Sequence, residues 1–243
     1  MSVHGTILGF RPALWPTLIA LPALALTLAL GTWQVERLAW KRALISTIES
    51  RLAAEPVALP GHDIDGAAWE YRRVTLVGRF RHDQEIHLLA HSGRGNLGYQ
   101  IITPLQRPDG GFVLVSRGWV PSANKDPATR PAGQLAGDVA VHGLVRKPWR
   151  QGWFVPDNDP GANQWFHGDI DSMLRHIGVA GPRIFVDADA RPNPGGLPIG
   201  GQTRLNIPNN HLQYAVSWYG AALALSVIYF VWHRQQGRWG RAQ

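Results

Sequence analysis

Residues 209–234 read N-N-H-L-Q-Y-A-V-S-W-Y-G-A-A-L-A-L-S-V-I-Y-F-V-W-H-R. From Leu212 to Trp232, none of the 21 residues carries a charge. A helix of about 20 apolar residues is long enough to cross the hydrocarbon core of a bilayer. We therefore predict a transmembrane helix over 210–232, followed by a short basic tail over 233–243.

A histidine, His211, directly precedes this uncharged run. An imidazole at that depth is costly unless it has a partner, so it is a candidate for function. Histidine is also a common axial ligand of haem iron. A membrane protein that handles a cofactor is therefore the first hypothesis that the stretch suggests.

A second uncharged run, Pro12–Trp33, predicts another transmembrane helix over 12–33. A cleaved signal peptide is the alternative, because residues 29–31 (Ala-Leu-Gly) resemble a cleavage site. The run is longer than the apolar core of a typical signal peptide, and only Arg11 supplies a positive start. These two features favour an uncleaved anchor.

The orientation of the two predicted helices follows from the cations beside them. The second helix is followed by three arginines, Arg234, Arg238 and Arg241, which predict a cytoplasmic C-terminus. The first helix is followed by Arg37, Lys41 and Arg42, which favour the opposite orientation, but long loops translocate largely regardless of charge. We therefore predict a membrane hairpin of two terminal transmembrane helices, with a cytoplasmic N-terminus over 1–11, an extracytoplasmic domain over 56–207 and a cytoplasmic tail.

Composition indicates a folded domain between the helices, because only 17% of the residues are charged and 11 are tryptophan. The net charge of +7 raises the question of nucleic acid as a partner. Arg11 and the three C-terminal arginines supply four of these charges, and no dense basic run lies between them. Anionic lipid headgroups explain this pattern better, so we expect a lipid bilayer and no nucleic acid.

The chain contains no cysteine. This excludes a disulfide framework, a zinc ribbon, an iron–sulfur cluster and a thiol nucleophile. Apart from Met1, Met173 is the one methionine, and soft Cu(I) sites need cysteine or methionine. A copper-donating role is therefore disfavoured.

Residues 34–55 predict a juxtamembrane amphipathic helix, because Leu38, Ile45 and Ile48 recur at helical spacings. We expect it to continue the first membrane helix and to end before Pro56. Cations and tryptophans alternate at its start, at Trp33, Arg37, Trp40 and Lys41. They form either an interfacial anchor belt or a cationic rim for an acidic ligand, and spacing alone favours the belt.

The middle of the chain alternates polar and apolar residues over short segments, as strands do. Six such segments lie at 70–80, 84–91, 98–105, 111–120, 138–147 and 183–188. One helix is predicted near 169–177, with Asp169 or Asp171 near its start and Gly178 beyond its end. Regular hairpins and few helices predict an antiparallel β-rich α+β domain, either a sandwich or a partial barrel.

Several apparent motifs fail on their context. G-R-G-N-L-G at 93–98 fits a nucleotide-binding pattern, but strand-like sequence follows it where a helix is required, which indicates a hairpin loop. His87 and His91 would stand about 13 Å apart on a strand, too far to share one metal ion. Ser116 lacks the flanking glycines of a nucleophile elbow. None of these strings forms a convincing active site.

Four strings occur together in one order on this topology: G-T-W-Q-V-E-R-L-A-W-K at 31–41, G-Y-Q-I-I-T-P-L at 98–105, V-S-R-G-W-V-P at 115–121 and N-N-H-L-Q-Y-A-V-S-W-Y-G at 209–220. In this combination the chain closely resembles the Surfeit-locus-1 (Shy1) family over nearly its whole length. Ser116 stands where many members have asparagine, and its hydroxyl keeps the hydrogen-bonding character.

The resemblance implies an assembly factor for haem–copper terminal oxidases, not an enzyme. Such a protein binds haem a in the membrane and helps to place it in the catalytic subunit. It implies subunit I of the oxidase as a partner and haem a synthase as a further one. In bacteria the protein lies in the inner membrane with its domain in the periplasm. His211 matches the axial ligand of the haem iron, and Trp218 matches a tryptophan beside that haem.

Helical spacing is compatible with these roles. Tyr214, Ala215 and Trp218 follow His211 by three, four and seven residues and therefore share one face. A macrocycle there could stack on Trp218 and keep its propionates at the watery rim. The predicted cations for that rim are Arg37, Lys41, Arg204 and Arg117.

Small residues spaced by four predict where the two membrane helices approach each other. Gly220 with Ala224 and Ala25 with Ala29 have this spacing. His211 has an alternative interpretation too, in which it bonds a headgroup or an interhelical carbonyl while Trp218 simply packs. Two other classes also stay open: a membrane-tethered periplasmic binding or sensor protein without a cofactor, and an envelope hydrolase.

Overall fold

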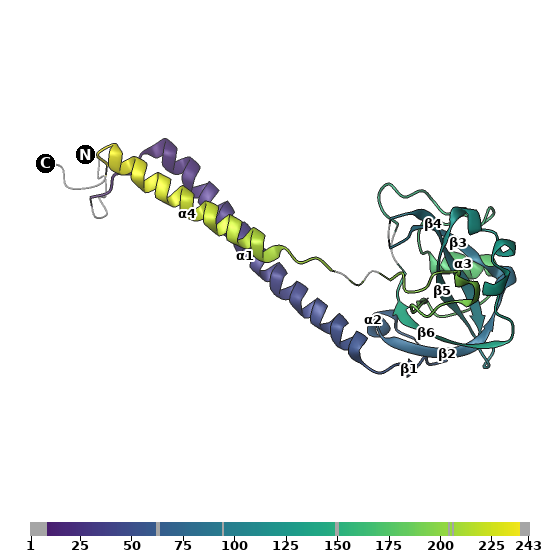
Figure 1. The fold of residues 1–243 in the computed structure, drawn as a ribbon. Coiled ribbons are helices and arrows are strands. Elements are labelled where there is room, and N and C mark those ends of the chain that lie inside the picture. The colour runs from purple at the N-terminus through teal and green to yellow at the C-terminus, as the bar shows by residue number, and fades with distance from the viewer. Residues whose placement is uncertain are drawn as a thin grey trace. The chain divides into compact units, whose positions relative to one another are not determined.

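The computed structural model describes residues 9–61, 64–93, 95–148, 151–203, 205 and 207–238. The chain forms two compact units, shown in Figure 1. One, the helical unit, combines Met1–Thr47 with Asn206–Gln243. The other, the strand-rich domain, spans Ile48–Leu205.

Two long helices are α1, Leu14–Ala53, and α4, His211–Gln235. Both are long and apolar enough to cross a membrane, as the two uncharged runs predict. Helix α1 continues without a break through the predicted juxtamembrane segment and ends before Pro56, as predicted. Proline disfavours the helical conformation in the residue before it, which accounts for this end.

In the helical unit, α4 lies antiparallel to the first part of α1, and Figure 1 shows them side by side. Hydroxyl pairs join the two helices along their length. Thr32 Oγ1 lies 3.1 Å from the Tyr219 hydroxyl, and Thr17 Oγ1 lies 2.6 Å from that of Tyr229. Each pair satisfies the hydrogen-bonding groups of two side chains from different helices.

The predicted small-residue contacts are wrong in position. Gly220 and Ala224 on α4 are exposed, as are Ala25 and Ala29 on α1. The close approach occurs instead at Gly31, where a Cβ atom would lie 2.8 Å from Cε1 of Tyr219. Four-residue spacing recurs on several faces of an apolar helix, so it identifies the kind of contact but not the face that makes it.

The described residues of the strand-rich domain form a seven-stranded sheet. Its strands are β1 (Val57–Ala58), β2 (Arg73–Phe80), β3 (Ile86–His91), β4 (Leu97–Gln106), β5 (Phe112–Pro121), β6 (Asp138–Arg146) and β7 (Phe185–Ala188). They pair in the order β1-β2-β6-β7-β5-β4-β3, and β2 pairs also with β4. The sheet therefore returns on itself as a barrel-like structure, one of the two predicted forms.

All six predicted strand segments are strands, and β1 is an additional short one. Most pairs are antiparallel as predicted, but β1 pairs with β2 and β7 with β5 in parallel. The helix between β6 and β7 permits the second of these, because a parallel pair needs a long connection.

Short helices complete the domain: α2 (Gly66–Trp69), α3 (Ile170–Ile177) and the 3₁₀ turns η1 (His82–Gln84), η2 (Ser122–Asn124), η3 (Pro127–Thr129), η4 (Pro131–Gly133) and η5 (Pro194–Gly196). Helix α3 matches its prediction. The Asp169 side chain accepts from the Ser172 amide, and Gly178 ends the helix in the left-handed conformation.

The core has two parts because alternate residues of a strand point to opposite faces. On β5, Val113 and Val115 join the apolar cluster inside the barrel, whereas Leu114 faces the cluster that packs under α3. Trp165 and Met173 belong to this outer cluster and are fully buried. Residues 112–115 of this strand are therefore all apolar.

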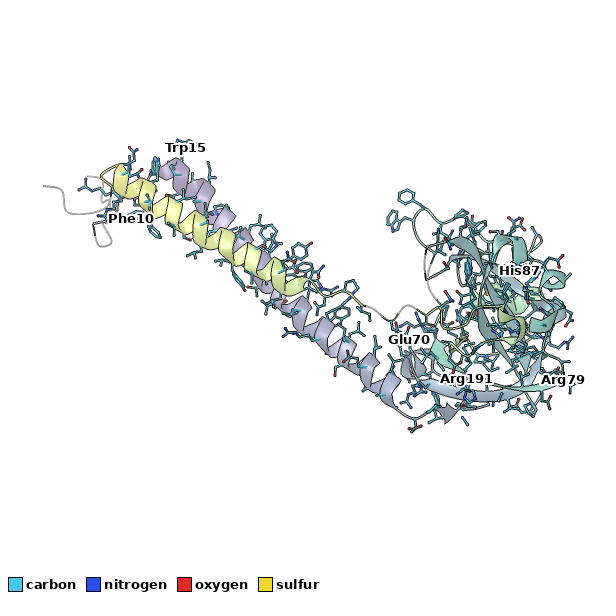
Figure 2. The ribbon with its side chains drawn as sticks, in the orientation of Figure 1. Phe10, Trp15, Glu70, Arg79, His87 and Arg191 are labelled. Carbon is cyan, nitrogen blue, oxygen red and sulfur yellow. The ribbon has the colours of Figure 1, made fainter. Side chains whose placement is uncertain are left out.

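The two histidines that resemble a metal pair lie on β3, as predicted. Strand β3 pairs with β4 from Ile86 to His91. The described residues of the glycine-rich string, 93 and 95–98, lie between these strands and at the start of β4. His87, labelled in Figure 2, bonds the buried Glu85 carboxylate at 2.9 Å. Its imidazole therefore serves the packing of the domain.

Candidate functional site

The site begins with the first residue of α4, His211, which is half-buried in the helical unit. Asn210 is the N-cap residue, but its side chain makes no capping hydrogen bond. The imidazole rather than the cap thus provides the main polar contact at this end of α4.

That contact is with Gln34 of α1. The Nδ1 atom of His211 lies 2.7 Å from Oε1 of Gln34. An amide carbonyl oxygen only accepts hydrogen bonds, so Nδ1 carries the proton and donates it. The lone pair of the neutral ring is then on Nε2, which makes no hydrogen bond to any other residue that the structure describes.

Gln34 is a site residue that the sequence interpretation did not identify. It is 9% exposed and lies on the face of α1 that also buries Gly31 and Leu38. An amide buried in apolar surroundings is costly unless it is hydrogen-bonded. The sequence pattern that could have identified Gln34 is its position between Gly31 and Leu38, at helical spacing, within the string at 31–41.

The other predicted residues of α4 divide between two faces. Ala215 is buried and Trp218 is half-buried, on the side that faces α1 together with His211. Tyr214 is 53% exposed and lies on the flank of that side. A flat apolar ligand bound at His211 would therefore contact Trp218, which lies one helical turn beyond Ala215, and would have Tyr214 at its side.

Two predicted cations lie near Gln34 on α1. Arg37 and Lys41 follow Gln34 by three and seven residues, on the same side of the helix. Arg37 is exposed and its guanidinium lies 4.5 Å from the centre of the Trp40 ring, while Lys41 is half-buried. The arrangement suits an interfacial belt and a cationic rim equally. A third predicted cation, Arg204, lies outside the described residues.

The fourth predicted cation, Arg117, does not fit a rim. It lies on β5 of the strand-rich domain and is 1% exposed. Its guanidinium donates to the Gly133 carbonyl and lies 4.7 Å from the centre of the Phe80 ring. Burial lowers the pKa of Arg117 to about 10. An open rim needs an accessible charge, so Arg117 belongs to the packing of the domain.

A second histidine, His233, stands at the opposite end of α4 and is completely buried. Its Nδ1 donates to the Tyr229 carbonyl at 2.8 Å, and its Nε2 accepts from the Ala13 amide at 3.0 Å. The ring of Phe10, labelled in Figure 2, lies 5.1 Å away. Both nitrogens are thus used within the protein, and neither has a lone pair for a ligand.

One family model matches the segments of α1 and α4 that form the site. The model of the SURF1 family matches residues 21–223, a range that includes Gln34, His211 and Trp218. The chain belongs to the SURF1 family. Members of this family are known as assembly factors for cytochrome oxidase rather than as enzymes.

Individual relatives give the same result. Surfeit locus protein 1 of Homo sapiens is 39% identical over 217 residues, which cover 83% of this chain and 72% of the human protein. That of Rattus norvegicus is 38% identical over 228 residues, or 88% of this chain and 73% of the relative. A SURF1-like protein of Monosiga brevicollis is 39% identical over 235 residues, or 92% and 88% of the two chains.

Proposed function

We propose that this SURF1-family protein binds haem a and assists its insertion into the catalytic subunit of a haem–copper terminal oxidase. The observation that carries the proposal is the 2.7 Å bond between His211 and Gln34. This bond is made by Nδ1 and leaves the Nε2 lone pair as a potential ligand. Family membership supports a role in oxidase assembly.

His211 would be the axial ligand of the haem iron, through Nε2. Gln34 is then the residue that orients the imidazole. Metal-bound histidines typically donate their other N–H to a carbonyl or carboxylate, which fixes the tautomer and makes the ligand nitrogen more basic. The donor set fits haem iron, because neutral imidazole is one of its usual ligands.

The neighbouring residues suit a flat amphipathic cargo. Trp218 would stack on the macrocycle, and Tyr214 would flank it. Arg37 and Lys41 would attract the propionates, because carboxylates are favoured near cations at a membrane surface. Trp218 and Tyr214 both remain partly exposed, which suits a carrier that must also release its cargo.

We place the protein in a bacterial inner membrane, with both termini in the cytoplasm and the strand-rich domain in the periplasm. The two apolar helices and the arginines after α4 support this orientation. The partners would be subunit I of the oxidase and haem a synthase, besides the lipid bilayer.

Haem binding is tested by the absorbance spectrum of the full chain, purified in detergent from cells that make haem a. We expect haem a in a fixed ratio to protein. Protein that is folded and inserted but carries no haem a would contradict the proposal. The remaining hypothesis would then be a membrane-tethered binding or sensor protein without a cofactor.

Orientation is tested by reporter fusions. A reporter that is active in the periplasm should work when fused after Trp33 and should be inactive at the C-terminus. If the mature protein began near Thr32, the first segment would be a cleaved signal peptide and the hairpin would be wrong.

A further inference from the structure

The strand-rich domain carries a short, well-defined turn between β6 and α3. The Val155 amide donates to the Gly152 carbonyl at 3.1 Å, which closes a four-residue turn. The Gln151 side chain donates to the Val155 carbonyl at 2.7 Å and to an Asp157 carboxylate oxygen at 3.1 Å. These bonds hold the turn, whose two corner residues are Trp153 and Phe154.

Both corner side chains are completely exposed, at 101% for Trp153 and 100% for Phe154. Turn corners usually carry glycine, proline, asparagine, aspartate or serine. Two other tryptophans of the domain pack inside it, with Trp119 at 6% and Trp165 at 1% exposure. The stability of the domain does not explain two bare aromatic rings, and exposed apolar patches mark interaction sites.

We propose that this aromatic turn, residues 151–156, anchors the strand-rich domain to the surface of the bilayer. Tryptophan is enriched at membrane interfaces, because one edge of its ring is polar and the rest apolar. The six residues of the turn, Gln151–Pro156, carry no charge, so insertion would not require a charged side chain to lose its hydration. The Val155 amide and carbonyl are already paired, which lowers the cost of bringing this backbone into the interface.

The bilayer is favoured over a protein partner because the domain is covalently joined at both ends to helices that can span a bilayer. The domain continues into α1 at one end and reaches α4 at the other, and both helices can span a membrane. Tethering turns binding into an intramolecular event, so a small anchor suffices. This inference rests on the proposed membrane hairpin and does not depend on haem binding.

The test uses the absence of cysteine from the chain. The full-length variant Phe154→Cys is labelled with a polarity-sensitive fluorophore and placed in phosphatidylcholine–phosphatidylglycerol vesicles that contain a lipid with a quencher on its headgroup. Ala123→Cys, at an exposed position of a polar turn, is the negative control. Val216→Cys on the exposed face of α4 is the positive control, read with a quencher on the acyl chain.

We expect a blue-shifted Phe154→Cys probe that is quenched several-fold more than the Ala123→Cys probe. Adding Trp153→Ser should bring its quenching down towards the Ala123→Cys level, because the second anchor is lost. Quenching equal to that of Ala123→Cys, while Val216→Cys is quenched, would overturn the inference and leave a protein as the remaining candidate partner of the turn. An unquenched Val216→Cys probe would instead contradict the hairpin itself.

Discussion

The two ends of α4 carry the same side chain in opposite roles. His233 is fully buried, and both of its nitrogens bond to the protein backbone. His211 is half-buried and uses one nitrogen, towards Gln34. Burial alone would have ranked His233 as the more notable residue. The number of ring nitrogens already engaged distinguishes them better, because a ligand needs a free lone pair.

The side chains around the two histidines differ in the same way, since one imidazole is enclosed and the other is accessible. At the His233 end, Phe10, Tyr229 and Trp232 pack their rings against the imidazole at centroid distances of 5.1, 4.2 and 4.9 Å. At the His211 end, Tyr214 and Trp218 stay partly open. One end of the α1–α4 helix pair is closed by packing, whereas the other presents a polar atom beside accessible rings.

The largest expected effect separates the two histidines directly. His211→Ala should remove most of the bound haem a, because no neighbouring apolar group replaces an axial bond. His233→Ala should retain haem and instead lower thermal stability, because the Ala13 amide loses its acceptor at a cost of about 1–3 kcal/mol. Haem absorbance per protein and the melting temperature of each detergent-purified variant measure the two effects.

Each histidine variant is the control for the other. Equal loss of haem in both would mean that haem loss reports a damaged hairpin, not a missing ligand. Stoichiometric haem with an unchanged spectrum in His211→Ala would show that His211 is not the ligand of the haem iron.

The second effect concerns the residue that orients His211. Gln34→Ala should weaken haem binding by about 10- to 100-fold, as is typical when the hydrogen-bond partner of a metal-bound histidine is lost. It should also shift the haem absorbance, since the ligand nitrogen becomes less basic. Gln213→Ala, an exposed glutamine on α4, is the matched control and should change neither quantity.

If Gln34→Ala had an unshifted spectrum and wild-type haem affinity, Gln34 would not influence a histidine that binds the iron. His211 would then make an interhelical bond of a purely structural kind. This variant therefore tests the observation that carries the proposed function.

Local pattern made much of the fold predictable. The uncharged runs predicted α1 and α4, and period-two alternation predicted six strands with their hairpins. The pairing of β7 with β5 in parallel was not predictable, because it depends on where the chain returns after α3. Neither was the closure of the barrel through β2 and β4, which rests on two residue pairs far apart in sequence.

The candidate site also contains residues that the sequence could identify and residues that it could not. His211 stood out because a polar side chain in an apolar run is conspicuous. Gln34 did not, since its importance comes from a partner 177 residues away. Arg117 was misplaced for a related reason: a charge in a strand reads as exposed, yet tertiary packing encloses it. Local pattern therefore identified candidate residues, and tertiary contacts decided which of them share a site.

A third, smaller effect is expected from the aromatic ring near His211. Trp218→Ala should weaken haem binding by about 2- to 12-fold, since aromatic stacking contributes about 0.5–1.5 kcal/mol beyond area burial. Trp232→Ala, at the closed end of the same helix, should leave haem affinity unchanged. Titration of both variants with haem checks the difference, and equal weakening would show that the effect passes through helix packing.

The smallest effect is expected at the rim. Arg37 is exposed and its guanidinium already lies over Trp40, so an ion pair with a propionate would form in water. Exposed pairs contribute about 0–1 kcal/mol, which corresponds to a loss of up to about fivefold in haem affinity for Arg37→Gln. The loss should shrink as salt is raised, because exposed charges are screened. Arg234→Gln, at the closed end of α4, carries the same charge change and should have no effect. A salt-independent loss at Arg37 would point to its packing on Trp40, and the interfacial belt would then be the correct interpretation of these cations.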